Sequence, residues 1–98
     1  KIIEFDRRDF LPGLIISSIN PAVQAELQLP WDSKGFVVID PGHLAERIGL
    51  KAGDIILEAN GRQLRTGNDI DEFLRQDSRR GAILIQRGSR QIMLRFRL

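Results

Sequence analysis

A chain of 98 residues, of which 42% are hydrophobic and 29% charged, supplies one hydrophobic core and excludes both a two-domain protein and a disordered tail. The absence of cysteine excludes a disulfide framework and a thiolate zinc site. No apolar run approaches the roughly 20 residues that span a bilayer, so we expect no direct membrane insertion. The chain starts at Lys1 without the layout of a signal peptide, and we expect it to be a segment of a longer protein.

Arginines concentrate in the last quarter of the chain, although the formal net charge is only +2. A basic region of this kind can bind phosphate backbones. The chain also carries 13 acidic residues, no Tyr and one Trp, and it contains no nucleic-acid-binding motif. We therefore expect no nucleic-acid partner and interpret the arginines as a solvated face, with polyanion binding as the alternative. They are Arg75, Arg79, Arg80, Arg87, Arg90, Arg95 and Arg97.

The first third of the sequence predicts one strand and one short helix. Residues 1–10 alternate apolar and charged side chains in part, and Pro12-Gly13 then marks a turn. Leu14 to Ile16 is a short apolar, partly β-branched run that predicts a strand. Asn20 can cap the free amides of a helix, and Pro21 suits its first position, so a helix is predicted over Pro21 to Leu29.

The middle of the chain predicts two strands around a short helix. Gly35 to Ile39 is a buried-strand run, and Leu44 to Ile48 predicts one or two helical turns closed by Gly49. Asp54 to Ala59 is the second strand. Asn60-Gly61 then predicts a tight hairpin into a return strand over residues 62–64, because both positions tolerate positive φ.

The last third predicts a capped helix and a final hairpin. Thr66 and Asp69 resemble a capping box that opens a helix through about Gln76. Gly81 restarts a strand and Arg87-Gly88 marks a turn. In the final strand Arg95 and Arg97 face away from the apolar side chains of Ile92, Leu94, Phe96 and Leu98. Together the elements predict an α+β fold, with a five- to six-stranded antiparallel, partly open barrel capped by two or three short helices.

The run from Gly49 to Gly61 resembles the PDZ domain, in which a helix is followed by "GL-x-x-GD-x-I" and then "NG". Gly35 to Gly42, together with Ala45, matches the strand and loop that precede this motif in the family. The resemblance extends from about Leu11 to Leu98 and identifies residues 1–98 as a single PDZ domain, with residues 1–10 as a candidate linker from a preceding domain.

The early turn at Pro12-Gly13 and the extra helix before Gly35 are similar to the PDZ domains of HtrA-type (Deg-type) serine proteases. This resemblance implies a regulatory or substrate-tethering domain beside a protease domain, in bacterial protein quality control in the periplasm or cell envelope. It also implies that oligomers form through the full-length protein. Related domains occur in site-2 and C-terminal-processing proteases, in type II secretion proteins and beside aspartic-protease domains, and these are alternative hosts.

The resemblance further implies where a ligand binds. The C-terminal end of a polypeptide, or an unfolded protein segment, would add as a strand to the edge formed by Leu14, Ile15 and Ile16. Its terminal carboxylate would lie on backbone amides of the loop Leu11-Pro12-Gly13-Leu14. The pocket for its last side chain would be lined by Leu14, Ile16, Ile70, Phe73 and Leu74. For the last three, which form one apolar helix stripe, a place in the core is the alternative.

All of these pocket residues are apolar, and we therefore expect an apolar terminal residue such as Val, Leu, Ile or Phe. Burial of such a side chain contributes roughly 1.5 to 3 kcal/mol. Pro12 departs from the family, because it stands where an aliphatic residue would supply an amide donor. Binding would be weaker, or Arg7 or Arg8 would compensate, or the groove would accept internal segments.

Catalytic chemistry finds little support in this segment. His43 is the only histidine, in a Pro-Gly-His turn, and no serine stands in a nucleophile motif. We therefore expect no enzyme activity, no metal and no cofactor in this fragment. Trp31 is expected to pack over the short helix, with an interface contact as the alternative. A non-catalytic assembly domain that docks on a partner, for example in a secretion system, is the second functional hypothesis.

Overall fold

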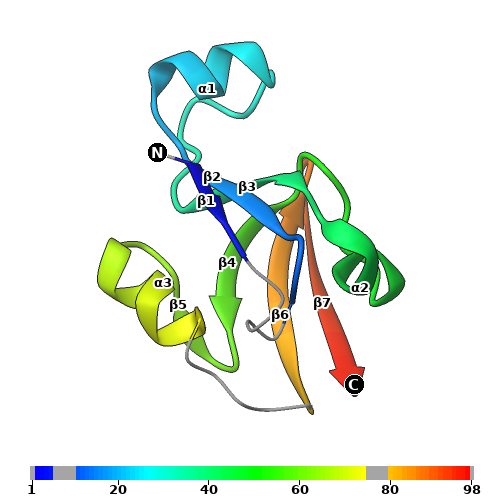
Figure 1. The fold of residues 1–98 in the computed structure, drawn as a ribbon. Helices are drawn as coiled ribbons and strands as arrows, with labels where there is room; N and C mark the ends of the chain where they lie inside the picture. Colours follow the sequence, from blue (N-terminus) through cyan, green and yellow to red (C-terminus); the bar gives the residue numbers. More distant parts are fainter. Residues whose placement is uncertain (1, 6–10, 75–79, 98) are drawn as a thin grey trace.

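The computed structural model describes residues 2–5, 11–74 and 80–97, with the backbone alone at Leu74. Within this part of the chain, strands and helices alternate along most of the sequence (Figure 1). The elements are β1 (Ile2–Glu4), β2 (Ile15–Ser18), α1 (Pro21–Glu26), β3 (Phe36–Asp40), α2 (Gly42–Arg47), β4 (Ile55–Ala59), β5 (Arg62–Gln63), α3 (Gly67–Leu74), β6 (Arg80–Arg87) and β7 (Arg90–Arg97).

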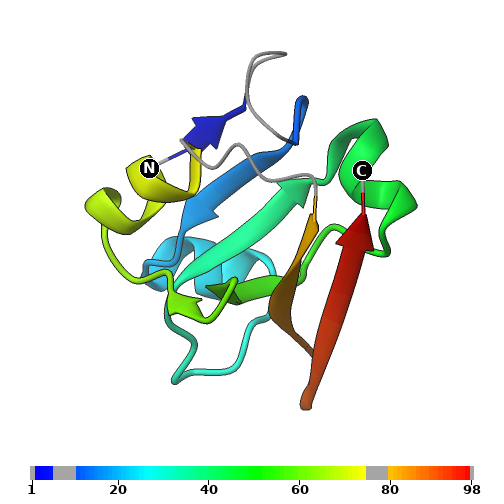
Figure 2. The same ribbon diagram turned by 90° about the horizontal axis from the view of Figure 1, so that it is seen from below.

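The strands form one antiparallel sheet in the order β1-β2-β3-β4-β6-β7, and β5 pairs with β4. The sheet is strongly curved, and β1 and β7 lie at its two edges, so the barrel stays open (Figures 1 and 2). Register shifts at Ile15/Ile16 and at Ile56/Glu58 bend the sheet, as bulges do. The predicted α+β class and the partly open antiparallel barrel are confirmed.

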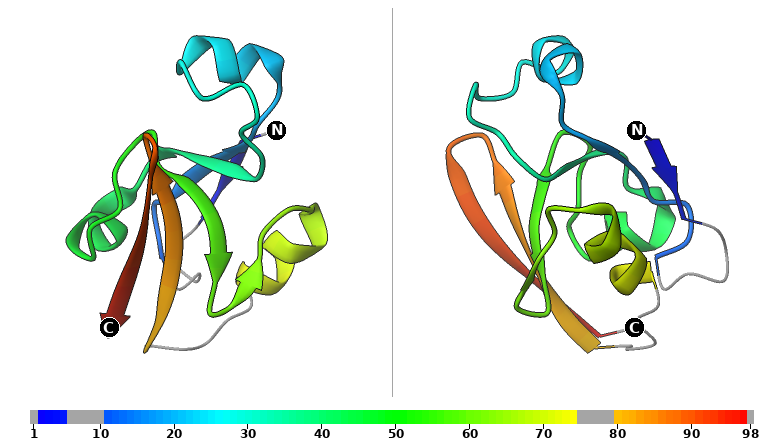
Figure 3. Two further views of the ribbon diagram at one scale, coloured as in Figure 1. Left: turned by 180° about the vertical axis from the view of Figure 1, so that it is seen from behind. Right: turned by 90° about the vertical axis from the view of Figure 1, so that its left-hand side faces the viewer.

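Helices α2 and α3 lie on opposite sides of the curved sheet, whereas α1 projects from one end (Figures 1 and 3). The predicted caps explain where two of them begin. Asn20 Oδ1 accepts the Val23 N–H at 2.9 Å, and Asp69 Oδ2 accepts the N–H groups of Arg65 and Thr66, each at 2.9 Å. Thr66 Oγ1 accepts the Asp69 N–H in return, at 3.3 Å. The capping box therefore forms as predicted.

The helix ends differ from the prediction. Helix α1 ends at Glu26, three residues before the predicted Leu29, and Gln28 then adopts a positive φ of 55°. A residue in the left-handed region cannot continue a right-handed helix. The predicted end of α3 near Gln76 lies outside the described residues.

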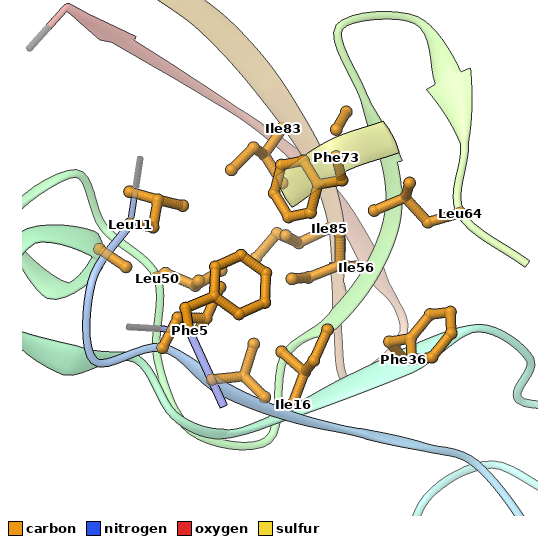
Figure 4. Packing of buried hydrophobic residues seen from close by; sticks show 14 of the residues in the cluster. Phe5, Leu11, Ile16, Phe36, Leu50, Ile56, Leu64, Phe73, Ile83 and Ile85 are labelled. Carbon is orange, nitrogen blue, oxygen red and sulfur yellow. The ribbon is translucent and has the colours of Figure 1, made fainter. Parts of the chain in front are cut away.

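The core lies inside the curve of the sheet, beneath α3 (Figure 4). In β7 the predicted alternation is confirmed, because Phe96 is buried while Arg95 and Arg97 are exposed. Leu98, the last residue of that pattern, lies outside the described residues. The buried cluster consists of Phe5, Leu11, Leu14, Ile16, Phe36, Val38, Ala45, Leu50, Ile56, Ala59, Leu64, Ile70, Phe73, Ile83, Ile85 and Phe96.

A partly buried ion pair between Asp54 and Arg87 fixes the turn that carries the Gly-Asp motif. The carboxylate of Asp54 is 1% exposed and accepts two bonds from the Arg87 guanidinium, each at 2.8 Å. It also accepts the Lys51 N–H at 2.8 Å, and Arg87 donates to the Gly49 carbonyl at 2.8 Å. The bond to Asp54 holds the pKa of Arg87 above its ordinary value. Bidentate geometry of this kind ties the turn over residues 49–54 to β6.

The expectation that Trp31 packs over the short helix is wrong. Its side chain is 88% exposed, and α1 contains no buried residue. Helix α1 projects from the sheet, so that it offers no shielded surface to an aromatic ring (Figure 1). His43, predicted in a turn, is exposed and lies in the first turn of α2.

Candidate functional site

The predicted site residues gather where β2 faces α3. Leu11, Leu14 and Ile16 are fully buried, and Ile70 and Phe73 of α3 are 1% exposed. All five belong to one hydrophobic cluster. Ile15 is half-buried, as is Pro12, and Gly13 is exposed with φ +84°. The side chain of Leu74 lies outside the described residues.

The edge of β2 that a ligand strand would need is not free, because β1 pairs with it. The two strands run antiparallel, with Ile2 opposite Ser17, Ile3 opposite Ile16 and Glu4 opposite Ile15. From two directions β1 is seen beside α3 (Figures 2 and 3). The N-terminal segment of this protein therefore occupies the strand position next to β2 on the side of α3.

The loop before β2 binds the end of this segment through its backbone. The Gly13 N–H donates to the Phe5 carbonyl oxygen at 3.0 Å, and the Phe5 N–H donates to the Leu14 carbonyl oxygen at 2.8 Å. The Leu14 N–H is used within the loop, where it donates to the Leu11 carbonyl oxygen at 3.2 Å. Pro12 has no N–H. Of the backbone nitrogens of Pro12, Gly13 and Leu14, that of Gly13 alone donates to Phe5.

The side chain of Phe5 fills the apolar space between the loop, β2 and α3. It is 4% exposed and meets the Phe73 ring edge to face, with ring centroids 5.7 Å apart and planes at 65°. Figure 4 shows the Phe5 ring between Leu11, Ile16 and Ile56, and the Phe73 ring beside Ile83. Sequence reasoning did not single out Phe5 as a site residue. The signal that could have found it was the partial alternation of apolar residues around Ile3 and Phe5.

The segment formed by residues 2–5 alternates between the groove and solvent. Phe5 is buried and Ile3 packs against the core, whereas Ile2 is 65% exposed and Glu4 is exposed. An open cleft of about 590 Å³ lies between this strand and the first turns of α3, where Thr66, Asn68, Ile70 and Asp71 contribute to its lining. The α3 side of β1 is therefore accessible to solvent.

Gly42 lies against the backbone of the Pro12-Gly13 loop. A Cβ at Gly42 would lie 2.7 Å from the Gly13 carbonyl carbon and 2.9 Å from the Pro12 carbonyl oxygen. The Gly42 N–H donates to Asp40 Oδ1 at 2.9 Å, which fixes this corner between β3 and α2. The sequence marked Gly42 only as a turn position, because nothing local shows that two distant loops meet there.

Among the described residues, no group of three or more His, Cys, Asp and Glu side chains is placed to hold a metal ion. In the same ranges, none of the helices combines the length and the apolar character that a membrane crossing requires.

The open sheet, the capped helix α3 and the groove between α3 and β2 define a class of protein. A family model described as "PDZ domain" matches residues 35–87, which is more than half of the chain. The chain therefore belongs to the PDZ domain family, as the sequence predicted. No curated protein matches it.

Two solved structures of HtrA-type proteins share the fold. One is described as the HtrA-type protease AlgW with a decapeptide; it has a TM-score of 0.80 and 23% identity, over 92% of this chain and 28% of that chain. The other is the HtrA3 PDZ domain bound to the phage-derived ligand FGRWV; it has a TM-score of 0.69 and 24% identity, over 99% of this chain and 86% of that chain. The similarity to HtrA-type PDZ domains is thus confirmed at the level of the fold.

Proposed function

We propose that this PDZ domain binds the C-terminal ends of polypeptides that terminate in an apolar residue, by strand addition to β2. One observation carries the proposal. Strand β1 pairs with β2 as an added strand. At its end the Phe5 carbonyl oxygen accepts the Gly13 N–H, and the Phe5 ring lies among Leu11, Ile16 and Phe73. These contacts support a site for one extended chain with an apolar side chain at its end.

A foreign ligand at this place would gain two kinds of interaction. Main-chain hydrogen bonds to β2 would supply affinity without regard to sequence. Burial of the terminal side chain in the cluster of Leu11, Leu14, Ile16, Ile70 and Phe73 would add roughly 1.5 to 3 kcal/mol. The terminal carboxylate would accept a hydrogen bond from the Gly13 N–H, whereas Pro12 has no N–H that could donate a second one.

We further propose that the domain regulates, or tethers substrates to, an adjacent protease domain of an HtrA-like serine protease in the bacterial envelope. The fold likeness to AlgW supports this role. The present chain spans only 28% of the AlgW chain, so protease activity would reside in another part of the protein. Unfolded protein segments are the corresponding ligands, and oligomers would form through the full-length protein.

The second candidate function is an assembly domain that docks on a neighbouring domain or subunit and takes no free peptide. The pairing of β1 with β2 favours it, because the sheet edge is already occupied. The exposed Trp31 supplies a contact for such docking.

Peptide titration distinguishes the two functions. Fluorescent pentapeptides that end in Phe, Leu or Val are titrated with the protein, each with a free and with an amidated C-terminus. FGRWV, the ligand of the HtrA3 PDZ domain, is included. Peptide recognition predicts saturable binding that amidation weakens by roughly 10- to 100-fold, since a charge-assisted hydrogen bond contributes roughly 1.5 to 3 kcal/mol. Assembly predicts no binding, and a terminal Asp is the control that neither function accommodates.

A further inference from the structure

We propose that the segment formed by residues 2–5 is an internal ligand of the groove, which foreign peptides must displace before they bind. Its side-chain pattern also defines the preferred ligand, a C-terminal sequence with an aliphatic residue two positions before a terminal Phe. The inference rests on the proposed function, because it concerns the same groove.

The backbone of the segment satisfies each requirement of a bound ligand. It pairs antiparallel with β2, opposite residues 15–17. Its last carbonyl oxygen, that of Phe5, accepts the Gly13 N–H at the loop where a terminal carboxylate is expected. The Phe5 N–H completes the ladder by donating to Leu14. The chain direction therefore matches that of a peptide whose C-terminus lies at the loop.

The side chains of residues 2–5 also correspond to those of a bound peptide. Phe5, at the position of a terminal residue, is buried against Phe73, and Ile3, two positions earlier, packs against the core. Ile2 and Glu4 face away from the core and are exposed. A competing ligand therefore gains most from a phenyl ring at its last position and an aliphatic side chain two positions before it. The two outward positions tolerate any residue.

Displacement is feasible because the internal ligand is held by few interactions. Strand β1 has three residues, and its α3 side borders the open cleft of about 590 Å³. It offers a neutral carbonyl to Gly13, whereas a foreign C-terminus offers a carboxylate, whose hydrogen bond is roughly twice as strong. The internal segment has a different advantage, because it belongs to the same chain as the groove. Its binding is intramolecular, with an effective concentration of about millimolar for a short linker.

The first test releases the internal ligand. The variant Phe5→Ala removes the ring and leaves the groove residues intact. The probe is the peptide Ile-Ile-Glu-Phe with a free carboxylate, which copies residues 2–5, and binding is measured by calorimetry. We expect the peptide to bind Phe5→Ala about tenfold or more tightly than the wild type. The state in which the groove is free to bind a peptide is no longer a minor population in the variant. The peptide is also expected to raise the melting temperature of the variant, since it refills the space left by Phe5.

The second test locks the internal ligand and does not depend on the stability of Phe5→Ala. Glu4 and Ile15 are opposite each other in the β1–β2 register. Directly opposite residues of antiparallel strands have Cα atoms about 4.5 to 5.5 Å apart, which is within the range of disulfide-linked residues. The chain has no cysteine, so the double variant Glu4→Cys/Ile15→Cys forms a single crosslink. We expect the reduced form to bind the peptide and the oxidised form to lose binding. Reductant should restore it.

The outcomes separate the inference from the proposed function. Equal affinities of the wild type and Phe5→Ala, or of the oxidised and reduced double variant, would overturn the internal ligand and leave peptide recognition standing. If folded Phe5→Ala and the reduced double variant bind no apolar-ended peptide, peptide recognition itself fails, and the inference fails with it. Folding is checked beforehand by amide NMR spectra.

Discussion

Gly42 shows how a single residue shapes the groove from outside it. Its φ of +74° lies in the region that glycine adopts freely. Its missing side chain lets the β3–α2 corner approach the backbone of Pro12 and Gly13. The loop that carries the Gly13 amide therefore packs closely against Gly42.

We predict that Gly42→Ala destabilises the fold and weakens peptide binding. The methyl group would press on the loop backbone, and overpacking of this kind costs roughly 1 to 3 kcal/mol. Gly88→Ala is the matched control, because Gly88 has a φ of +65° and no atom within 4 Å of the place that a methyl group would take. The strain of a left-handed backbone is common to both variants. Urea denaturation and peptide titration should show the additional loss in Gly42→Ala alone; equal losses would refute the role given to the contact.

At the level of the element, the start of α3 depends on a charged cap. Asp69 accepts two backbone N–H groups, from Arg65 and Thr66, and these bonds hold its pKa below the ordinary value of 3.8. Helix α3 supplies one wall of the groove through Ile70 and Phe73. The cap therefore sets where this wall begins.

We predict a pH-dependent contribution of Asp69 to stability. Because its pKa is lower in the folded state, the contribution is fully present above 3.8 and is lost as the pH falls through the folded value. The difference in unfolding free energy between the wild type and Asp69→Asn should thus be largest near neutral pH and shrink in acid. Thr66→Ala, which keeps the charge, should cost about 1 kcal/mol at neutral pH. Denaturation series across pH measure both, and a constant difference for Asp69→Asn would contradict the assignment.

At the level of the whole molecule, the two ends of the sheet differ in how firmly they are held. Strands β6 and β7 have eight residues each and pair along their full length. Strand β1 has three residues and covers the other end. Buried Ile83 and Ile85 anchor β6 in the core. Local opening is therefore expected to begin at β1.

We predict that native-state hydrogen exchange resolves this difference. The amides of Phe5 and Gly13 should exchange through a local opening that is insensitive to low denaturant. Amides in the middle of β6, such as those of Ile83 and Ile85, should exchange only through global unfolding. NMR detection at several urea concentrations provides the measurement. A common denaturant dependence for all four amides would mean that β1 does not open on its own.

The sequence alone predicted the family and most of the elements, although not strand β1, because these signals are local. Asn20, Asn60-Gly61 and the Thr66/Asp69 pair act within a few residues, and each has the predicted geometry. The motif over residues 49–61 is likewise a continuous run, so the PDZ fold could be recognised without coordinates. The proposed pocket residues on β2 and α3 were predicted from that resemblance.

Only the tertiary structure decided what lies in the groove. The pairing of β1 with β2, the burial of Phe5 against Phe73 and the approach of Gly42 to Gly13 all join residues that are distant in sequence. Trp31 is the opposite case, because the sequence predicted that its ring packs over the short helix and the structure leaves the ring exposed. A strand edge can pair with any extended segment, so its occupant depends on long-range geometry and burial, which local patterns do not encode.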